Sequence, residues 1–382
     1  MNTDAMPVLV VEGGPRERGR ASGEALRDKI AACLDAVDRV GEKDRGIPAR
    51  EFRARFLGET SFGDTIRRRT PELLDEVRGI AEGANQPFER MLTAQLMDEE
   101  WVYVRNKKYE MEADAGHCTG FAVQQGEGAL VGQNMDLGQW LDGYQAVVRH
   151  IDRDAGFDIQ VLTFAGYLGL CGMNRNGPAV CCNTLLDLDS SASGLPVAFI
   201  FRTLVQSASV AEAEKHVRAF PHASGQNYVI GGRDGVVSLE CSARQVAAFR
   251  PAELTDRVYH TNHALANKDT SYVDRHVKGK TIADRCRSPS SPARLASIAA
   301  RMGDLDRTID VATAMDALRA KDDPAAPVCR DGNNSAEDAQ IGFTFGSIIC
   351  EISDDPAMHV TAGPPCHSSY RRLDFPPSQV SS

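Results

Sequence analysis

The sequence predicts a layered α+β fold in which antiparallel sheets are covered by helices. Helix-rich and strand-rich stretches alternate along the 382 residues. Neighbouring strand-like runs are joined by short turns, which are typical of antiparallel hairpins and not of the longer βαβ crossovers. We therefore expect helices on the outer faces of the sheets, and we find no internal repeat.

The first part of the chain is predicted to contain one strand followed by helices. Residues 6–12, MPVLVVE, form a short apolar run that is typical of a strand. Residues 13–40 begin with a turn and continue with apolar residues at helical spacing. Residues 50–105 have helical character almost throughout. The charged stretch 105–116 lacks apolar periodicity, so we expect a flexible linker there.

In the remainder of the chain, strand-like runs alternate with helices. Helical patterns return at 195–219 and 291–320, whereas residues 265–292 are polar and loop-like. A turn at 233–235 predicts a hairpin inside the strand region 227–249. The other predicted strands are 118–124, 129–136, 144–152, 157–166, 177–185, 342–352 and 357–363.

The composition is that of an ordinary globular protein, with 42% hydrophobic and 25% charged residues. The formal net charge of −10 offers no basic face for phosphate, so we expect no nucleic-acid partner. No stretch approaches the roughly 20 apolar residues that a membrane helix needs. The N-terminal apolar run lacks a basic region before it. We therefore expect neither membrane insertion nor a signal peptide.

The sequence contains ten cysteines and no CxxC pair. Several lie within apolar runs such as GLCGMN and SIICEI. Such thiols are typical of a reducing compartment, whereas secreted disulfide scaffolds carry regularly spaced pairs. We therefore expect reduced, buried thiols and a cytoplasmic protein.

The stretch AGHCTGFAV, residues 115–123, places Cys118 at the start of a predicted strand. Two strand-like runs flank GEG at 126–128, and a symmetric register centred on Glu127 sets Cys118 opposite Asp136. Directly opposed residues have Cβ atoms about 4.5–5.5 Å apart. The spacing agrees with an acid beside a nucleophilic thiol. By itself it agrees equally with a half-buried core cysteine and a solvated turn acid.

We expect no metal and no cofactor. His260 and His263, in HTNH, have the spacing of half a metal site on a helix, but the flanking residues resemble a strand entering a loop. No third ligand accompanies them. The glycine pairs at 13–14 and 231–232 do not form a GxGxxG turn between a strand and a helix.

Four motifs occur in an order that resembles a known enzyme family. They are HCTGFAV…GALVGQNMDL, GYLGLCGMNRNGPAVCCNTL, VSLECS and YHTNHAL. The set is similar to the acyl-coenzyme A:6-aminopenicillanic acid acyltransferase family, which are N-terminal nucleophile (Ntn) hydrolases of the cysteine type, also called the C45 peptidase family. The wider group includes penicillin V acylases and bile salt hydrolases. The resemblance covers most of the chain.

The resemblance implies a precursor that cuts itself between His117 and Cys118. The cut would yield an α chain, 1–117, and a β chain, 118–382, which together form one structural domain. The fold implied is the four-layer αββα sandwich of Ntn hydrolases. After the cut, Cys118 would carry a free α-amine with an unperturbed pKa of about 7.7–8.0, which can serve as general base for its own thiol.

The resemblance also assigns roles to five further residues. Asp136, in the GQNxD pattern, would orient the α-amine. Asn262, in HTNH, would donate to the oxyanion, and Asn183, in CCNTL, would line the same site. Arg294 and Ser242 would contact the substrate.

The sequence departs from the family pattern at three positions. His117 precedes the nucleophile where the family often has glycine, which adopts a strained turn most cheaply. Ser290 replaces the acid of a DSxxR-like motif. Gln340 stands where the family has a late arginine, which implies substrate contacts unlike those of the penicillin acyltransferase.

Three functional hypotheses follow. The first is a self-processing amidohydrolase that cleaves a linear amide of a small N-acyl substrate through a thioester. The second is an N-acyltransferase that uses the same site, with acyl-coenzyme A or another acyl donor. The third is an unprocessed binding module without activity. The expected partners are the small-molecule amide and the two chains of one precursor, and a homo-oligomer is left open.

Overall fold

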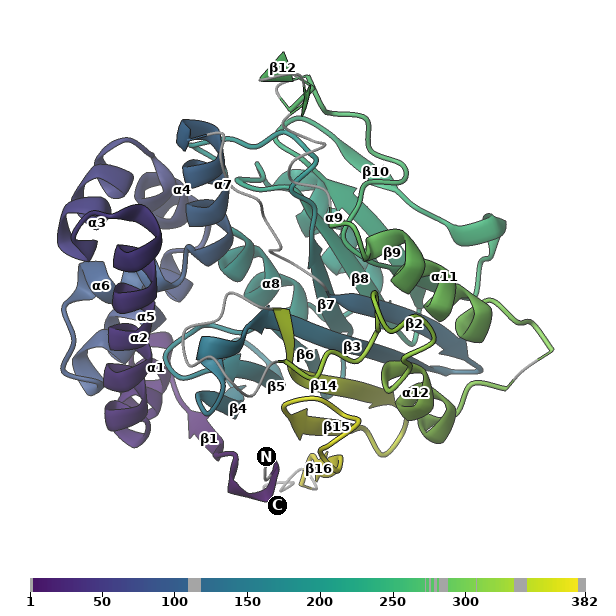
Figure 1. Cartoon of the computed structure of the whole chain (residues 1–382). Helices are drawn as coiled ribbons and strands as arrows, with labels where there is room; N and C mark the ends of the chain where they lie inside the picture. The colour runs from purple at the N-terminus through teal and green to yellow at the C-terminus, as the bar shows by residue number, and fades with distance from the viewer. Residues whose placement is uncertain are drawn as a thin grey trace.

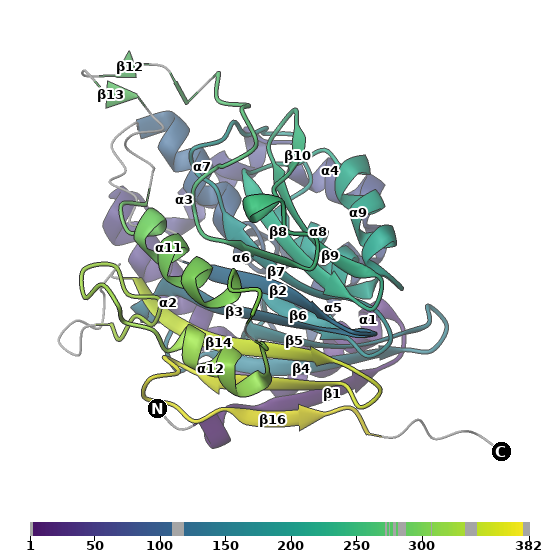
Figure 2. The same cartoon turned by 90° about the vertical axis from the view of Figure 1, so that its right-hand side faces the viewer.

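The structure is a computed structural model, in which two stacked sheets lie between layers of helices (Figures 1 and 2). The predicted α+β class, with mostly antiparallel sheets covered by helices, is confirmed. The residues that the structure describes are 3–108, 118–271, 273–274, 276–277, 280–281, 288–306, 308–332 and 342–376.

Among these described residues, the larger sheet has eight strands in the order β1-β4-β5-β6-β7-β8-β9-β10. The pair β1 and β4 is parallel, whereas the other neighbours are antiparallel. The strands are β1 (Val8–Glu12), β4 (Gln145–Asp152), β5 (Phe157–Phe164), β6 (Cys171–Asn174), β7 (Ala179–Thr184), β8 (Gln226–Gly232), β9 (Gly235–Cys241) and β10 (Val246–Ala248).

The smaller sheet has six strands within the described ranges, in the order β11-β2-β3-β14-β15-β16, and every pair is antiparallel. A separate ribbon is formed by β12 (His276–Val277) and β13 (Lys280–Thr281). The strands of the smaller sheet are β2 (Thr119–Gln125), β3 (Gly128–Gly138), β11 (Arg257–His260), β14 (Gly342–Ile352), β15 (Ala357–Ala362) and β16 (Arg371–Asp374).

The α-helices divide between the two outer faces of the sheets. The helices before residue 110 gather at one side of the larger sheet in Figure 1. They are α1 (Pro15–Ala25), α2 (Arg27–Arg45), α3 (Ala49–Gly58), α4 (Phe62–Arg69), α5 (Pro71–Gly83), α6 (Phe88–Ala94) and α7 (Met97–Lys108). On the larger sheet lie α8 (Val197–Gln206) and α9 (Val210–Ala219), and on the smaller sheet lie α11 (Ser291–Met302) and α12 (Val311–Leu318).

Single turns of 3-10 helix also occur. They are η1 (Thr3–Ala5), η2 (Gln139–Leu141) and η3 (Pro251–Glu253). The first strand and the helical regions predicted from the sequence are thus present, as are the later strands. The predicted linker begins inside α7 and continues into 109–117, which lie outside the described residues.

Close packing and buried charge join α1, α5 and α8. A methyl group on Gly19 would lie 2.1 Å from the carbonyl oxygen of Glu76, so only glycine permits this crossing of α1 and α5. The carboxylate of Glu76 pairs with Arg18 at 3.2 Å and with Arg202 at 3.0 Å, and all three side chains are buried. Because a buried charge needs a partner, this cluster fixes α8 relative to the first helices.

The main apolar core lies between the two sheets and extends beneath the first helices. A second, smaller core lies between the smaller sheet and α11 and α12, where Phe121 packs with Ile298, Met302 and Leu318. The inner strands of both sheets are buried over most of their length, because the sheets cover each other on one face and helices cover the other, whereas the edge strands β1, β10 and β16 are more exposed. Such burial on both faces explains why several strands read as apolar runs and not as alternating patterns.

The hairpin of β2 and β3 closes with a two-residue turn. Gln125 pairs with Gly128, which leaves Gly126 and Glu127 as the turn. Gly126 has a φ of +55°, a left-handed conformation that favours glycine and that tight hairpins require. The centre of the hairpin therefore lies between these two residues and not on Glu127.

The register of this hairpin differs by one residue from the symmetric prediction. Thr119 pairs with Asn134, so continuing the same register sets Cys118 beside Met135 and not beside Asp136. The Sγ atom of Cys118 accordingly lies 3.3 Å from the Sδ atom of Met135. The predicted cross-strand pairing of Cys118 with Asp136 was wrong, because turn length decides the register of a hairpin.

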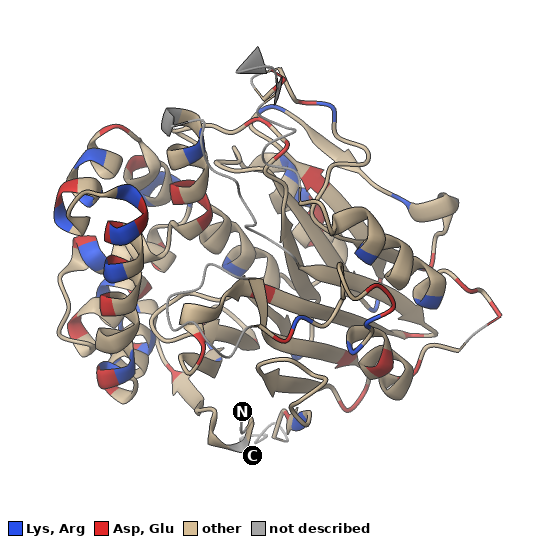
Figure 3. Cartoon of the chain, in the orientation of Figure 1, with Lys and Arg blue, Asp and Glu red and all other residues tan. Residues whose placement is uncertain are grey.

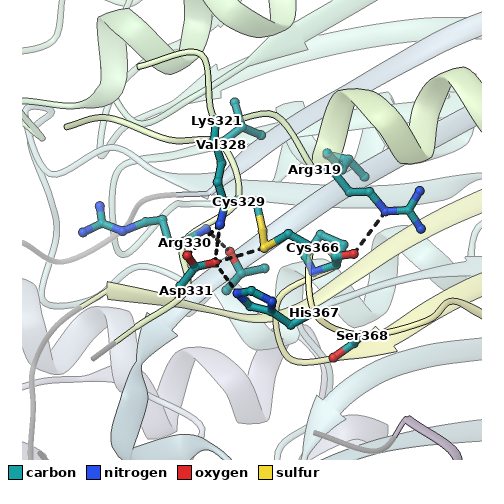
Figure 4. Close-up of a disulfide and its surroundings, with 12 residues drawn as sticks. Arg319, Lys321, Val328, Cys329, Arg330, Asp331, Cys366, His367 and Ser368 are labelled. Carbon is teal, nitrogen blue, oxygen red and sulfur yellow. Dashed lines mark hydrogen bonds and ion pairs between the residues drawn. A yellow bond between two sulfur atoms is a disulfide. The ribbon is translucent and has the colours of Figure 1, made fainter. Parts of the chain in front are cut away.

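The prediction that the cysteines are all reduced is wrong for one pair. Cys329 and Cys366 form a disulfide, and Figure 4 shows Asp331 beside it, with Lys321 and His367 approaching the same carboxylate. The two cysteines are 37 residues apart, and only the packing of the segment after α12 against the loop after β15 brings them together. The sequence argument for a reducing compartment assumed reduced thiols, and this disulfide contradicts that assumption. The described free cysteines are Cys33, Cys118, Cys171, Cys181, Cys182, Cys241 and Cys350.

Charged side chains lie mainly on the outer helices. Figure 3 shows basic and acidic residues interspersed on the helices before residue 110, whereas the strands are largely uncharged. No one-sided basic surface is therefore visible in this view. Within the described part of the chain, no helix combines the length and the apolar character needed to cross a membrane.

Candidate active site

A small pocket lies at the ends of β2 and β3, where they meet β7, α7 and α8. Its free space is about 20 Å³, which is roughly the room that one water molecule needs. The pocket is therefore small and largely filled by the side chains that line it. The lining residues are Met97, Asp98, Trp101, Cys118, Met135, Asp136, Leu137, Tyr167, Gly169, Leu170, Cys182, Thr184, Val197, Ala198 and Phe201.

Cys118 lies in this pocket, directly before β2, and is 4% exposed. Burial raises the pKa of its thiol to about 12, and the nearby carboxylate of Asp136 acts in the same direction. A hydrogen bond with the backbone of Asp136 and the charge of Arg294 oppose the rise. In the continuous chain the thiol is therefore neutral and needs a base before it can act as a nucleophile.

Asp136 lines the same pocket from β3 and is 1% exposed. Its Oδ1 atom accepts a hydrogen bond from the hydroxyl of Thr344 at 2.7 Å, while Oδ2 has no partner among the described residues. Burial raises the pKa of the carboxyl to about 7, and the charges of Arg330 and Arg294 limit the rise. Although the register differs from the prediction, the structure does bring the thiol and this carboxyl together.

Arg294 joins the nucleophile to the predicted oxyanion residue. This fully buried side chain lies on α11, and its Nη1 donates to the carbonyl oxygen of Cys118 at 2.8 Å and to the hydroxyl of Thr119 at 3.0 Å. Its Nη2 donates to Oδ1 of Asn262 at 3.1 Å. The guanidinium thus contacts the backbone of Cys118 and does not line the pocket, unlike the substrate contact that the sequence predicted.

The departure at Ser290 has a structural consequence. Its hydroxyl lies 3.2 Å from Nε of Arg294 and takes the position of a hydrogen-bond acceptor for the guanidinium. A neutral hydroxyl therefore contacts the positively charged guanidinium of Arg294, where the family pattern has an acid. That charge lies next to the carbonyl group of Cys118.

Asn262 follows β11 and is held on three sides. Its backbone N–H donates to Ser291 at 2.7 Å, and its Nδ2 donates to the carbonyl oxygen of Thr184 at 3.1 Å. Its Oδ1 accepts from Arg294. The amide is therefore fixed in orientation, close to the pocket residue Thr184 but not itself in the pocket lining.

A buried histidine–carboxylate contact supports the loop that carries Asn262. His260 ends β11, and its Nε2 lies 2.8 Å from Oε1 of Glu240 on β9. The same carboxylate accepts hydrogen bonds from the backbone N–H groups of Leu265, Ala266 and Asn267. Glu240 thus fixes the loop on both sides of Asn262.

Asn183 and Ser242 lie away from the pocket lining. Asn183 lies on β7 between Cys182 and Thr184, and alternation along the strand directs it to the opposite face from these two pocket residues. Its Oδ1 accepts from Asn227, and its buried Nδ2 has no partner among the described residues. The hydroxyl of Ser242 donates to Asp269 at 2.7 Å. His117 and Gln340 lie outside the described residues.

The sequence analysis missed the acidic residues that α7 brings to the site. Asp98 lines the pocket, and Glu99 is buried directly behind it. The only signal in the sequence was the run DEE in an otherwise helical stretch, which on a helix usually indicates a solvated face. Thr344, the partner of Asp136, was missed for a similar reason, since it lies more than two hundred positions further along the chain.

Comparison with known proteins finds a similar sequence and a similar structure. The chain is 28% identical over 267 residues to the acyl-coenzyme A:6-aminopenicillanic-acid-acyltransferase 40 kDa form of Emericella nidulans, which covers 69% of this chain and 71% of that protein. The solved structure of penicillin V acylase from Agrobacterium tumefaciens matches with a TM-score of 0.37 and 13% identity, over 68% of this chain and 86% of that one.

The family comparison covers the core of both sheets. The family described as acyl-coenzyme A:6-aminopenicillanic acid acyl-transferase matches residues 123–351, which is more than half of the chain. The matched region contains Asp136, Asn262 and Arg294, and it begins five positions after Cys118. The chain belongs to the acyl-coenzyme A:6-aminopenicillanic acid acyl-transferase family.

Proposed function

We propose that this protein is a self-processing cysteine amidohydrolase whose nucleophile is Cys118. The observation that carries the proposal is the convergence of a buried thiol and a buried carboxyl in one pocket, beside an arginine that contacts the carbonyl group of the same cysteine. The thiol lies at the first position before a strand, where a cut would leave it at a new chain end.

The first step is cleavage of the chain. The thiol of Cys118 gives its proton to the unpartnered carboxylate oxygen of Asp136 and attacks the carbonyl carbon of His117. The acyl group moves from nitrogen to sulfur as the peptide bond breaks, and the departing nitrogen takes up the proton. Water then hydrolyses the thioester and leaves a carboxylate on residue 117 and an α-amine on Cys118. The products are an α chain, 1–117, and a β chain, 118–382.

The cut supplies a second base, the α-amine of Cys118, for the reaction with the substrate. Burial holds the thiol neutral in the continuous chain, where the nitrogen of Cys118 belongs to a peptide bond and cannot accept a proton. A free α-amine titrates near pH 7.7–8.0 in ordinary surroundings, so it can take the proton of the thiol on its own residue. Asp136 is close enough to orient that amine, and its unpartnered Oδ2 is available to accept from it.

The second reaction is cleavage of a small N-acyl amide. The thiolate attacks the amide carbon, the amine leaves with a proton, and a thioester forms on Cys118. Water then releases the acid. Asn262 supports this step, because only one of its two Nδ2 hydrogens has a partner among the described residues and the other remains for an oxyanion.

Acyl transfer is the second candidate function. The 28% identical relative from Emericella nidulans is named as an acyltransferase, and an amine in place of water would resolve the same thioester to a new amide. Adding an amine acceptor to enzyme and donor, and measuring N-acyl product against free acid by mass spectrometry, separates the two reactions.

Intact mass spectrometry of the purified protein tests the proposal. Wild type should give two masses that sum to the chain plus one water, split between His117 and Cys118. Cys118→Ala should give one mass near 41.4 kDa. Cys33→Ala is the matched control, because it removes another buried free thiol from a helix remote from the pocket, and it should be cut like wild type. An uncut wild type, or a cut Cys118→Ala, contradicts the proposal and favours the non-catalytic binding module.

A further inference from the structure

We propose that Asp98 makes this site selective for amides that carry an ammonium group on a short alkyl chain. The inference rests on the proposed function, because it concerns the substrate of the same pocket. It adds a specificity residue from the helical segment before the cut, so that both chains of the processed protein would form the binding site.

Asp98 faces the nucleophile across the pocket. It lies on α7, is 6% exposed and lines the same small space as Cys118. Its Oδ2 accepts hydrogen bonds from the hydroxyl of Thr184 at 2.7 Å and from Nε2 of Gln226 at 2.6 Å. Its Oδ1 has no hydrogen-bond partner in the described part of the chain. One carboxylate oxygen is therefore fixed by the protein and the other is left for a ligand.

A second buried acid, Glu99, follows Asp98 on α7. Burial and the charge of Asp98 together raise the pKa of Glu99 to about 8, so at neutral pH Glu99 holds a proton. Burial also raises the pKa of Asp98, but the donors Thr184 and Gln226 oppose that rise. Glu99 likewise accepts two hydrogen bonds from the protein, so the feature that distinguishes Asp98 is its place in the pocket lining, where a ligand can reach the charge of the pair.

The protein supplies no cation to this charge. Neither lysine, arginine nor histidine is among the described residues that line the pocket, and no ion pair within the described ranges includes Asp98. A buried carboxylate without a counter-charge is costly, and a ligand ammonium would relieve that cost. The aromatic side chains of Trp101, Tyr167 and Phe201 line the same space and offer faces that attract a cation.

The negative charge would also oppose catalysis if nothing neutralised it. The charge of Asp98 contributes to the raised pKa of the Cys118 thiol, so it disfavours the thiolate. A substrate that brings a positive charge beside Asp98 removes this penalty when it binds. With an uncharged substrate, the charge of Asp98 still disfavours the thiolate. The preference for a positively charged substrate would therefore act on the chemical step as well as on binding.

Two matched substrate pairs test the inference on the processed wild-type enzyme. On the acyl side, 6-aminohexanoyl 4-nitroanilide is compared with heptanoyl 4-nitroanilide. On the amine side, N-heptanoyl-1,5-diaminopentane is compared with N-heptanoylhexylamine. We expect the ammonium member of one pair to have a kcat/KM at least about tenfold higher, since one charged hydrogen bond contributes that much discrimination. Equal rates within both pairs, or a preference for the neutral members, overturn the inference.

Variants separate a role in specificity from a structural role. Asp98→Asn should abolish the preference for the ammonium member, and hydrolysis of the neutral member should rise, because the charge that disfavours the Cys118 thiolate is gone. Glu99→Gln is the matched control one position along the helix, outside the pocket lining, and should keep the preference. A loss of activity in Asp98→Asn by the same factor for both members overturns the inference, because it would indicate that Asp98 pairs with the protein's own α-amine.

A binding measurement separates failure of this inference from failure of the proposed function. If no amide in either pair is cleaved, the proposed function fails, and selectivity is read from alkylation of Cys118. Butylammonium should protect Cys118 of wild type from iodoacetamide at concentrations about tenfold lower than 1-butanol requires. Equal protection by both compounds overturns the inference whether or not the enzyme hydrolyses amides.

Discussion

The carboxyl group of Asp136 should make the stability of the uncut protein depend on pH in a predictable direction. Its pKa rises from the usual 3.8 to about 7 because the group is buried. The folded state therefore holds this proton more tightly than the unfolded chain does. The contribution of this carboxyl to the stability of the folded protein is complete below pH 3.8 and is lost as the pH rises toward 7.

The size of the effect follows from these two values. With a pKa of 3.8 in the unfolded chain and about 7 in the folded protein, linkage gives a loss of about 2.5 kcal/mol in the free energy of unfolding between pH 5 and pH 8. The variant Asp136→Asn carries no titrating group at this position. It keeps a carbonyl oxygen that can accept from Thr344, so its local packing should change little.

Urea unfolding followed by far-ultraviolet circular dichroism measures the effect. Both proteins carry Cys118→Ala, so that both remain uncut and differ only at position 136. We expect the free energy of unfolding of the aspartate protein to fall, between pH 5 and pH 8, by about 2.5 kcal/mol more than that of Asp136→Asn. Parallel pH dependence in the two proteins would refute the raised pKa of the Asp136 carboxyl.

Two further predictions concern contacts that support the site. Arg294→Lys keeps the positive charge but loses the planar guanidinium that hydrogen-bonds to both Cys118 and Asn262. The midpoint of urea unfolding should therefore fall by an amount equivalent to about 1–3 kcal/mol. An unchanged midpoint would contradict this role of the guanidinium. Cys366→Ser should lower the free energy of unfolding by up to about 4 kcal/mol, because the disulfide with Cys329 closes a loop with a sequence separation of 37 residues. Reductant should lower the midpoint of wild type to that of this variant, and insensitivity to reductant would show that the bond does not form.

Local patterns were enough to predict most of the elements of the fold. The apolar run of β1, the helical periodicity of α5 and the turn between β8 and β9 depend on residues that are neighbours in the sequence. The same holds for the position of Cys118 directly before β2. These features could be predicted because the side-chain spacing of a helix or a strand is set by local backbone geometry, which does not depend on the rest of the chain.

The sequence alone determined the order of helices and strands, the α+β class, and the presence of a cysteine at a strand start with an acid on the next strand. The tertiary structure decided the register, because a two-residue turn and not a symmetric count sets Cys118 beside Met135. It also decided that Arg294 contacts the nucleophile's carbonyl group and that Asp98 enters the pocket. Those contacts join segments that are distant in the chain, and only the packing of sheets and helices brings such side chains within hydrogen-bonding distance.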